Sequence, residues 1–108
     1  MTRQTFDAFQ VIADPSRRQI LQLLSKDNLT INTVAENFDM SRPAVSKHIK
    51  ILYGAGFISI TDIGRERYCT LKQDGFNELQ DFINYFDKFW VSKLKKLETL
   101  LNSKAIGK

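Results

Sequence analysis

Apolar residues recur every three or four positions through most of the chain, which predicts a mainly helical protein. Residues 2–13 form the first predicted helix. Asp14 and Pro15, a capping residue followed by proline, then predict the start of a second helix. Apolar positions between 20 and 24 give this helix a broad buried face, and the polar residues 26–28 end it.

Two further short helices follow in close succession. Thr30 is a capping residue for a third helix that we expect to end near Asp39. Ser41 can cap the next helix, and Pro43 lies in its first turn, where a missing N–H costs little. Two short helices joined by a tight turn predict a helix-turn-helix at about residues 30–53.

The helix predicted for residues 41–52 has one apolar and one basic face. Val45, Ile49 and Leu52 share the inward side at spacings of four and three. The outward side carries Arg42, Ser46, Lys47 and Lys50. Residues 41–52 contain no acid, whereas an ordinary solvated helix mixes both signs of charge. This profile is typical of a DNA-recognition helix.

A hairpin is predicted after the recognition helix. Residues 57–61 alternate as a strand does, and residues 67–71 form a second strand, with Gly64 at the flexible tip. Together they predict a β-wing at about residues 57–71. Arg65 and Arg67 lie at and beside its tip, from which an arginine can enter a narrow minor groove.

The last predicted helix, at about residues 74–102, is long and amphipathic. Its regularly spaced apolar positions run from residue 76 to residue 101, and a helix of about 26 residues would measure about 39 Å. Its apolar surface is wider than a single stripe, so one part can cover the core while another meets a partner. We expect self-association through Phe6, Phe9, Phe82, Phe86, Phe89, Trp90, Leu94 and Leu97. A ligand pocket around Trp90 is the alternative, but such aromatics anchor interfaces without a small molecule.

Composition narrows the possible partners. The 108 residues predict a single domain, and sixteen Lys and Arg against twelve Asp and Glu give a net charge of +4, which favours polyanions. The sequence has no apolar stretch for a membrane span or a signal peptide, so we expect a cytoplasmic protein.

Cys69, the lone cysteine, is interpreted as a half-buried structural thiol rather than a redox sensor or metal ligand.

Enzyme chemistry is not indicated. His48 is the only histidine, and a packing or DNA-backbone role suits it better than catalysis. The sequence has no nucleophile with a base and orienting acid, no glycine-rich phosphate loop and no paired carboxylates in a pocket-like segment. Arg17 and Arg18 oppose the helix dipole, which suggests a structural salt bridge or, alternatively, a phosphate partner.

The order of these elements resembles the ArsR-type winged-helix transcriptional regulators over nearly the whole chain. The residues that carry the resemblance lie at 13–21, 40–52, 55–58 and 64–68. It implies a winged helix-turn-helix, mainly α with a small β-hairpin, and a long C-terminal dimerisation helix. It also implies a homodimer, joined through its first and last helices, that sits on an operator and blocks transcription.

The resemblance also assigns residues to the DNA. The family's base-reading positions fall on Arg42, Pro43, Ser46 and Lys47, with Ser41 and His48 beside them. Arg42 and Lys47 can donate to guanine O6 and N7. The remaining contacts are Lys50 to a phosphate, Arg65 in or over the minor groove, and Arg67 to a phosphate or to Glu66.

The chain departs from the metal-sensing members of that family. Those members carry a cysteine pair before the recognition helix, where residues 34–40 here contain no thiol. Others use Asp and His pairs on the last helix, but residues 73–102 contain no histidine. We therefore expect no metal at either place and no cofactor.

The sequence thus predicts a sequence-specific, dimeric DNA-binding repressor that acts by promoter occlusion on a double-stranded, pseudo-palindromic operator. The alternative is a protein-interaction module whose long aromatic helix binds another protein, with only weak, non-specific nucleic-acid affinity. The sequence names neither the operator nor a small-molecule effector.

Overall fold

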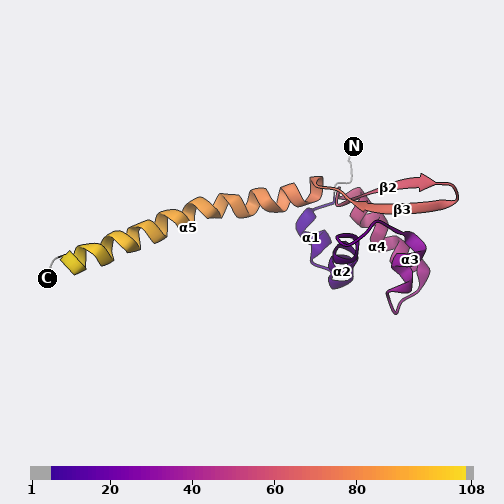
Figure 1. The fold of residues 1–108 in the computed structure, drawn as a ribbon, viewed down its shortest axis with the longest axis horizontal. Coiled ribbons are helices and arrows are strands. Elements are labelled where there is room, and N and C mark those ends of the chain that lie inside the picture. The colour runs from indigo at the N-terminus through magenta and orange to yellow at the C-terminus, as the bar shows by residue number, and fades with distance from the viewer. Residues whose placement is uncertain (1–5, 107–108) are drawn as a thin grey trace. The chain divides into compact units, whose positions relative to one another are not determined.

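The computed structural model describes residues 6–106, with side chains described as far as residue 103. The described chain divides into two compact units, the first ending at Glu78 and the second beginning at Leu79. The elements in chain order are α1 (Ala8–Ile12), α2 (Pro15–Leu24), β1 (Leu29–Thr30), α3 (Ile31–Glu36), α4 (Arg42–Gly54), β2 (Ile58–Ile63), β3 (Glu66–Leu71) and α5 (Asp74–Ile106). Within the first unit, α2, α3 and α4 lie on one side of the β2–β3 hairpin (Figure 1).

Side-chain oxygens cap the first four helices. Asp7 accepts from the backbone N–H of Phe9, and Asp14 accepts from those of Ser16 and Arg17. The caps of α2, α3 and α4 are the predicted ones, with Thr30 accepting from Thr33 at 3.1 Å and Ser41 from Ala44 at 3.2 Å. Each bond satisfies a donor that the helix itself leaves unpaired. Local sequence therefore determines where these helices begin.

Two helix boundaries differ from the prediction. α1 covers only Ala8–Ile12 of the predicted residues 2–13, of which 2–5 lie outside the described residues. Its buried residues are Ala8 and Val11, whereas Phe6 and Phe9 are exposed. α3 ends at Glu36, where we expected it to end near Asp39, because its last carbonyls are already met by turn bonds from residues 37 and 38. The turn before α4 thus spans residues 37–41.

The sheet has three antiparallel strands in the order β1-β3-β2, one more than the predicted hairpin. β1 comprises two residues, with Leu29 opposite Cys69 and Thr30 opposite Tyr68. No alternating pattern can develop over two residues, which is why periodicity did not reveal this strand. β1 joins the start of α3 to the central strand of the sheet.

The hairpin lies within the predicted residues 57–71, but its strands extend further toward the tip than expected. Its strands pair as far as Ile63 and Glu66, which leaves a two-residue turn of Gly64 and Arg65. Gly64 has φ +64°, and no other residue type in the described chain adopts a positive φ. A glycine at the first turn position suits a type II′ hairpin. The paired strands therefore continue up to the residue next to Arg65.

The core of the first unit forms where the helices meet the sheet. The predicted inward residues of α4, Val45, Ile49 and Leu52, are at most 1% exposed. They share the core with Phe57, whose ring meets that of Phe76 edge-on at 4.9 Å between centroids. Burial of the apolar side of α4 leaves its other side to solvent.

α5 begins at Asp74, and its side chains from residue 80 to residue 103 are exposed. The predicted span of about 74–102 matches it closely, and the helix extends further to Ile106. None of the helices formed by residues 6–106 is long and apolar enough to cross a membrane.

Candidate nucleic-acid interface

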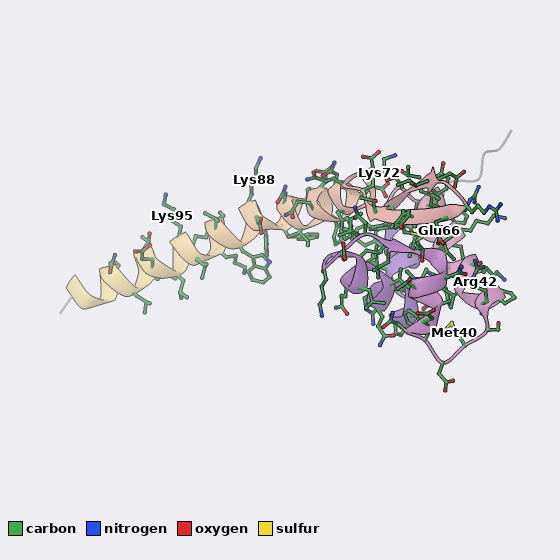
Figure 2. The ribbon with its side chains drawn as sticks, turned by 45° about the vertical axis from the view of Figure 1, so that its right-hand side comes forward. Met40, Arg42, Glu66, Lys72, Lys88 and Lys95 are labelled. Atoms are coloured by element: carbon green, nitrogen blue, oxygen red, sulfur yellow. The ribbon has the colours of Figure 1, made fainter. Side chains whose placement is uncertain are left out.

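The outer face of α4 presents the side chains that the sequence singles out. Arg42, Pro43, Lys47 and Lys50 are exposed, Ser46 is half-buried, and Ser41 is exposed at the cap. Figure 2 shows Arg42 on the helical part of the first unit and Glu66 on the hairpin. The ion pairs within residues 6–103 are Arg17–Asp14, Arg67–Asp62 and Lys72–Asp74. The charges of Lys47 and Lys50 are therefore available to a polyanion.

A groove with a volume of about 750 Å³ lies between α4 and the hairpin. Six predicted DNA-binding residues line it: Arg42, Pro43, Ser46, Lys47, Lys50 and Arg67. Ser41, His48 and Arg65 do not. Sequence reasoning missed the other lining residues, which are Ile31, Ile49, Tyr53, Ile60 and Asp62. Tyr53 could have been found from its spacing of three from Lys50, which places both on one helix face.

Arg42 is held in place by two side chains. Its Nε donates to Oδ1 of Asn32 at 2.8 Å, and its Nη1 donates to Oγ of Ser46 at 2.9 Å. Asn32 belongs to α3, ten residues earlier in the chain, and sequence reasoning did not identify it. No sequence signal links the two, because their contact exists only once α3 and α4 have packed.

The wing arginines differ in their partners. Nε of Arg67 donates to Oδ1 of Asp62 at 3.0 Å, so the expected pairing with Glu66 is wrong. Asp62 and Arg67 are direct cross-strand partners, whereas Glu66 is adjacent to Arg67 on the same strand and its side chain points to the opposite face. Arg65, in the exposed turn, forms no ion pair with any described residue.

His48 contacts α2. Its Nδ1 lies 3.2 Å from Nη1 of Arg17. A guanidinium can only donate, so Nδ1 of His48 is the acceptor in this contact. The imidazole of the recognition helix is therefore tied to the protein, consistent with the packing role that the sequence suggested.

Arg17 and Arg18 bond to the end of α1. Arg17 donates from Nε to the carbonyl of Val11 at 2.7 Å, and Arg18 donates from Nη1 to that of Ile12 at 2.6 Å. These carbonyls lie at the C-terminal end of α1, where the helix itself supplies no N–H partner for them. Positive charge at this end also complements the helix dipole. The two arginines thus act mainly through backbone carbonyls, with a weaker ion pair from Arg17 to Asp14 at 3.8 Å.

Two acidic groups have shifted titration. Burial alone would raise the pKa of the Asp14 carboxyl, but backbone hydrogen bonds from Arg17 and Ser16 and the nearby positive charge outweigh it, so this pKa is lowered. Burial raises the pKa of the Cys69 thiol. Cys69 is fully buried, so the expected half-buried position is wrong, because α2 and α3 pack against the strand that carries it. Within residues 6–106 no three His, Cys, Asp or Glu side chains gather into a group that could hold a metal ion.

The second unit presents an apolar helix surface. The predicted interface residues Phe82, Phe86, Phe89, Trp90, Leu94 and Leu97 are all exposed in the monomer, Trp90 by 56%. Aromatic rings lie edge-to-face along the helix, as in Phe89 with Trp90 at 5.0 Å between centroids. Lys88 and Lys95 project together from one side of α5 (Figure 2).

A short helix-turn-helix, a capped basic recognition helix and a hairpin wing together define a winged helix-turn-helix DNA-binding protein. The sequence profile described as bacterial regulatory protein, arsR family, matches residues 14–59. A crystal structure of an ArsR family transcriptional regulator is 34% identical to this chain, with a TM-score of 0.73 and coverage of 80% of this chain and 89% of that one. The chain belongs to the ArsR family of bacterial transcriptional regulators, a class of DNA-binding proteins and not of enzymes.

Two more relatives extend the comparison. The transcriptional repressor SdpR of Bacillus subtilis is 39% identical over 85 residues, which cover 75% of this chain and 94% of SdpR. A homodimeric winged helix-turn-helix DNA-binding domain from Mycobacterium bovis is 17% identical, with a TM-score of 0.61 and coverage of 81% of both chains. That second likeness concerns the fold alone.

Proposed function

We propose that this regulator is a homodimeric repressor that occludes a promoter by occupying a pseudo-palindromic operator. The observation that carries the proposal is the groove in which cations of α4 and of the wing converge. Two such surfaces related by a two-fold axis would read half-sites about one helical turn, roughly 10–11 bp, apart. Because bacterial promoter DNA lies in the cytoplasm, the proposed function implies a cytoplasmic protein.

Each DNA-contacting residue has a proposed role. Arg42 and Lys47 donate to guanine in the major groove, and Ser46 contacts a base or a phosphate. Lys50 neutralises a phosphate. Arg65, exposed at the hairpin turn, enters the minor groove. Pro43 is a further base-reading position, Ser41 and His48 lie beside these residues, and Arg67 reaches a phosphate only when its pair with Asp62 opens.

The dimer forms through exposed apolar residues of each unit. They are Phe6 and Phe9 in the first unit, and Phe82, Phe86, Phe89, Trp90, Leu94 and Leu97 in the second. The helix seam through Leu79, Trp90 and Leu101 has steps of 11 residues, and 11 residues make three turns at 3.67 per turn. Two helices paired along it would wind around each other in a right-handed supercoil. The SdpR resemblance supports repression, and the exposed apolar surface of α5 supports the assembly.

Charge along α5 supports an antiparallel pairing. Residues 74–87 contain four acids and no Lys or Arg, whereas residues 88–106 contain five lysines and one acid. Antiparallel helices place the acidic half of one beside the basic half of the other, while parallel helices place like charges together. Salt should therefore weaken the dimer, which sedimentation at increasing ionic strength measures.

The test is fluorescence anisotropy with the DNA upstream of this protein's own gene and a shuffled duplex of the same composition, at about 150 mM salt. The proposal expects nanomolar binding to the first, two subunits per site, and a preference over shuffled DNA of about 10³-fold or more. Weak binding that ignores sequence on every candidate promoter would contradict it. That outcome would favour the exposed α5 surface as a docking site for a different protein.

A further inference from the structure

The guanidinium of Arg42 is oriented before any DNA is present. Asn32 and Ser46 each accept one N–H from it, at 2.8 Å and 2.9 Å. A guanidinium has five N–H donors, so three remain. These include at least one hydrogen on each terminal nitrogen, which is the pair that an end-on fork to guanine O6 and N7 requires.

Asn32 is itself firmly placed. It lies in the first turn of α3, which Thr30 caps by accepting from the backbone N–H of Thr33. The Thr30 hydroxyl also donates to Oγ1 of Thr33 at 2.9 Å. Because arginine can only donate, the amide oxygen of Asn32 must face it, which settles the orientation of that amide.

We propose that Asn32 is a positioning residue that sets the base specificity of Arg42. Without it, only Ser46 on the same helix would hold an exposed side chain with many rotamers, and Arg42 could turn to a neighbouring phosphate as readily as to a base. The hydrogen bond from Arg42 to Asn32 fixes the plane of the guanidinium. The free N–H groups on its two terminal nitrogens can then reach only one base. This inference rests on the base-reading role proposed for Arg42.

The experiment measures binding of the full chain to the operator, to single-base variants of it and to shuffled DNA. Asn32→Ala should reduce the preference for operator over variants by roughly 5-fold, the worth of one hydrogen bond, and leave affinity for shuffled DNA within about twofold. Asn32→Asp keeps the acceptor oxygen. It should keep the base preference while weakening all DNA binding alike, because a carboxylate repels phosphates.

A double-mutant cycle separates positioning from an independent contact. In an Arg42→Ala background, Asn32→Ala should have no further effect, since the group that it positions is gone. Equal losses from Asn32→Ala in both backgrounds, or equal losses on operator and shuffled DNA, would overturn the inference. Asn32→Ser, whose hydroxyl is too short to replace the amide, repeats the test if the alanine variant does not fold.

The same data distinguish two failures. If Arg42→Ala leaves base preference intact, the proposed role of Arg42 fails and the positioning role falls with it. If Arg42→Ala relaxes preference but Asn32→Ala does not, only the positioning role is wrong.

Discussion

At the scale of single residues, the arginines show how available acceptors decide function. Arg17 and Arg18 donate hydrogen bonds to backbone carbonyls at the end of α1, and Arg67 forms an ion pair with Asp62 across the hairpin. Arg42 is bonded on one side only, and Arg65 forms no ion pair with the described residues. Arg42 keeps three of its five N–H donors and Arg65 has no ion pair with a described residue, and both lie on the two elements that would enter DNA grooves.

Arg42 and Lys50 should differ in how their loss affects binding. Arg42→Ala should relax preference at one base and cost about 1–3 kcal/mol on operator DNA. Lys50→Ala should weaken operator and random DNA alike and flatten the salt dependence by about one unit, because it removes one phosphate contact. Salt titrations on both duplexes measure this. Equal losses on the two DNAs for Arg42→Ala would contradict base reading.

Asp14 should make stability depend on acid pH. Its pKa is lowered in the folded chain, so the ionised cap stabilises the fold above about pH 5, and this contribution is lost as pH falls through the lowered pKa. Asp14→Ala should cost about 1 kcal/mol at pH 7. Asp14→Asn is the matched control, since it keeps a cap acceptor that does not titrate. Urea unfolding from pH 7 to pH 3 should show a shallower decline for Asp14→Asn than for the wild type.

Sequence patterns predicted the exposed face of α4 better than the hydrogen-bond partners of its residues. The outward face of α4 follows from helical period alone, because the same period that buries Val45 and Ile49 exposes the residues between them. The Asn32–Arg42 and Arg17–His48 contacts join residues 10 and 31 positions apart. They depend on how helices pack, which no local pattern encodes.

At the scale of elements, capping residues determine where α3 and α4 begin, and a close contact between Gly75 and Phe57 determines how α5 begins. The caps at Thr30 and Ser41 were predictable, since capping involves residues two or three positions apart. β1 was not, because two residues become a strand only through β3. The first turn of α5 is set by Gly75, where a Cβ would lie 2.8 Å from the Phe57 ring.

Gly75→Ala and Gly54→Ala should therefore have different effects. At Gly75 the added methyl meets the fully buried Phe57, which packs against Phe76 and cannot yield, so we expect a net loss of about 1–2 kcal/mol despite the better helix propensity of alanine. At Gly54 the methyl meets Phe6, which is 38% exposed and can rotate away. That variant should stay within about 0.5 kcal/mol of wild type. Thermal or urea unfolding checks both, and similar losses would contradict the account.

A charge placed on the α5 seam should separate the subunits. Leu94→Asp would put a carboxylate in the apolar interface and should weaken the dimer about 100-fold or more, because an unpaired buried charge costs about 3 kcal/mol or more. Ser92→Asp, on the opposite side of the same helix, is the control and should leave the dimer intact. Analytical ultracentrifugation distinguishes the two. If Leu94→Asp still forms the dimer, this face of α5 is not part of the interface.

At the scale of the whole molecule, the central strand joins the parts of the first unit. Cys69 in β3 pairs with Leu29 on one side and with Ile60 on the other. Its side chain is fully buried, and burial raises the pKa of the thiol, which disfavours the reactive thiolate. Access to this sulfur therefore requires the sheet or its helical cover to open.

Cys69 should consequently report on unfolding. A thiol reagent such as Ellman's reagent should label the native protein slowly, at a rate limited by opening of the core, and label it at once in denaturant. Destabilising variants such as Gly75→Ala should speed native labelling in proportion to their lost stability when opening is a rapid equilibrium. Rapid labelling of the folded wild type would contradict the burial of this thiol.

One residue belongs to both the wing sheet and the helix-turn-helix. Thr30 ends β1 opposite Tyr68 and at the same time caps α3. The base of the wing and α3, whose Asn32 accepts a hydrogen bond from Arg42, are therefore joined at Thr30, and the protein itself would set the spacing between the proposed major-groove and minor-groove contacts. DNA whose grooves do not match that spacing must bend or twist to fit, at an energy that depends on its own sequence. Base pairs that the protein never touches would then contribute to the choice of operator.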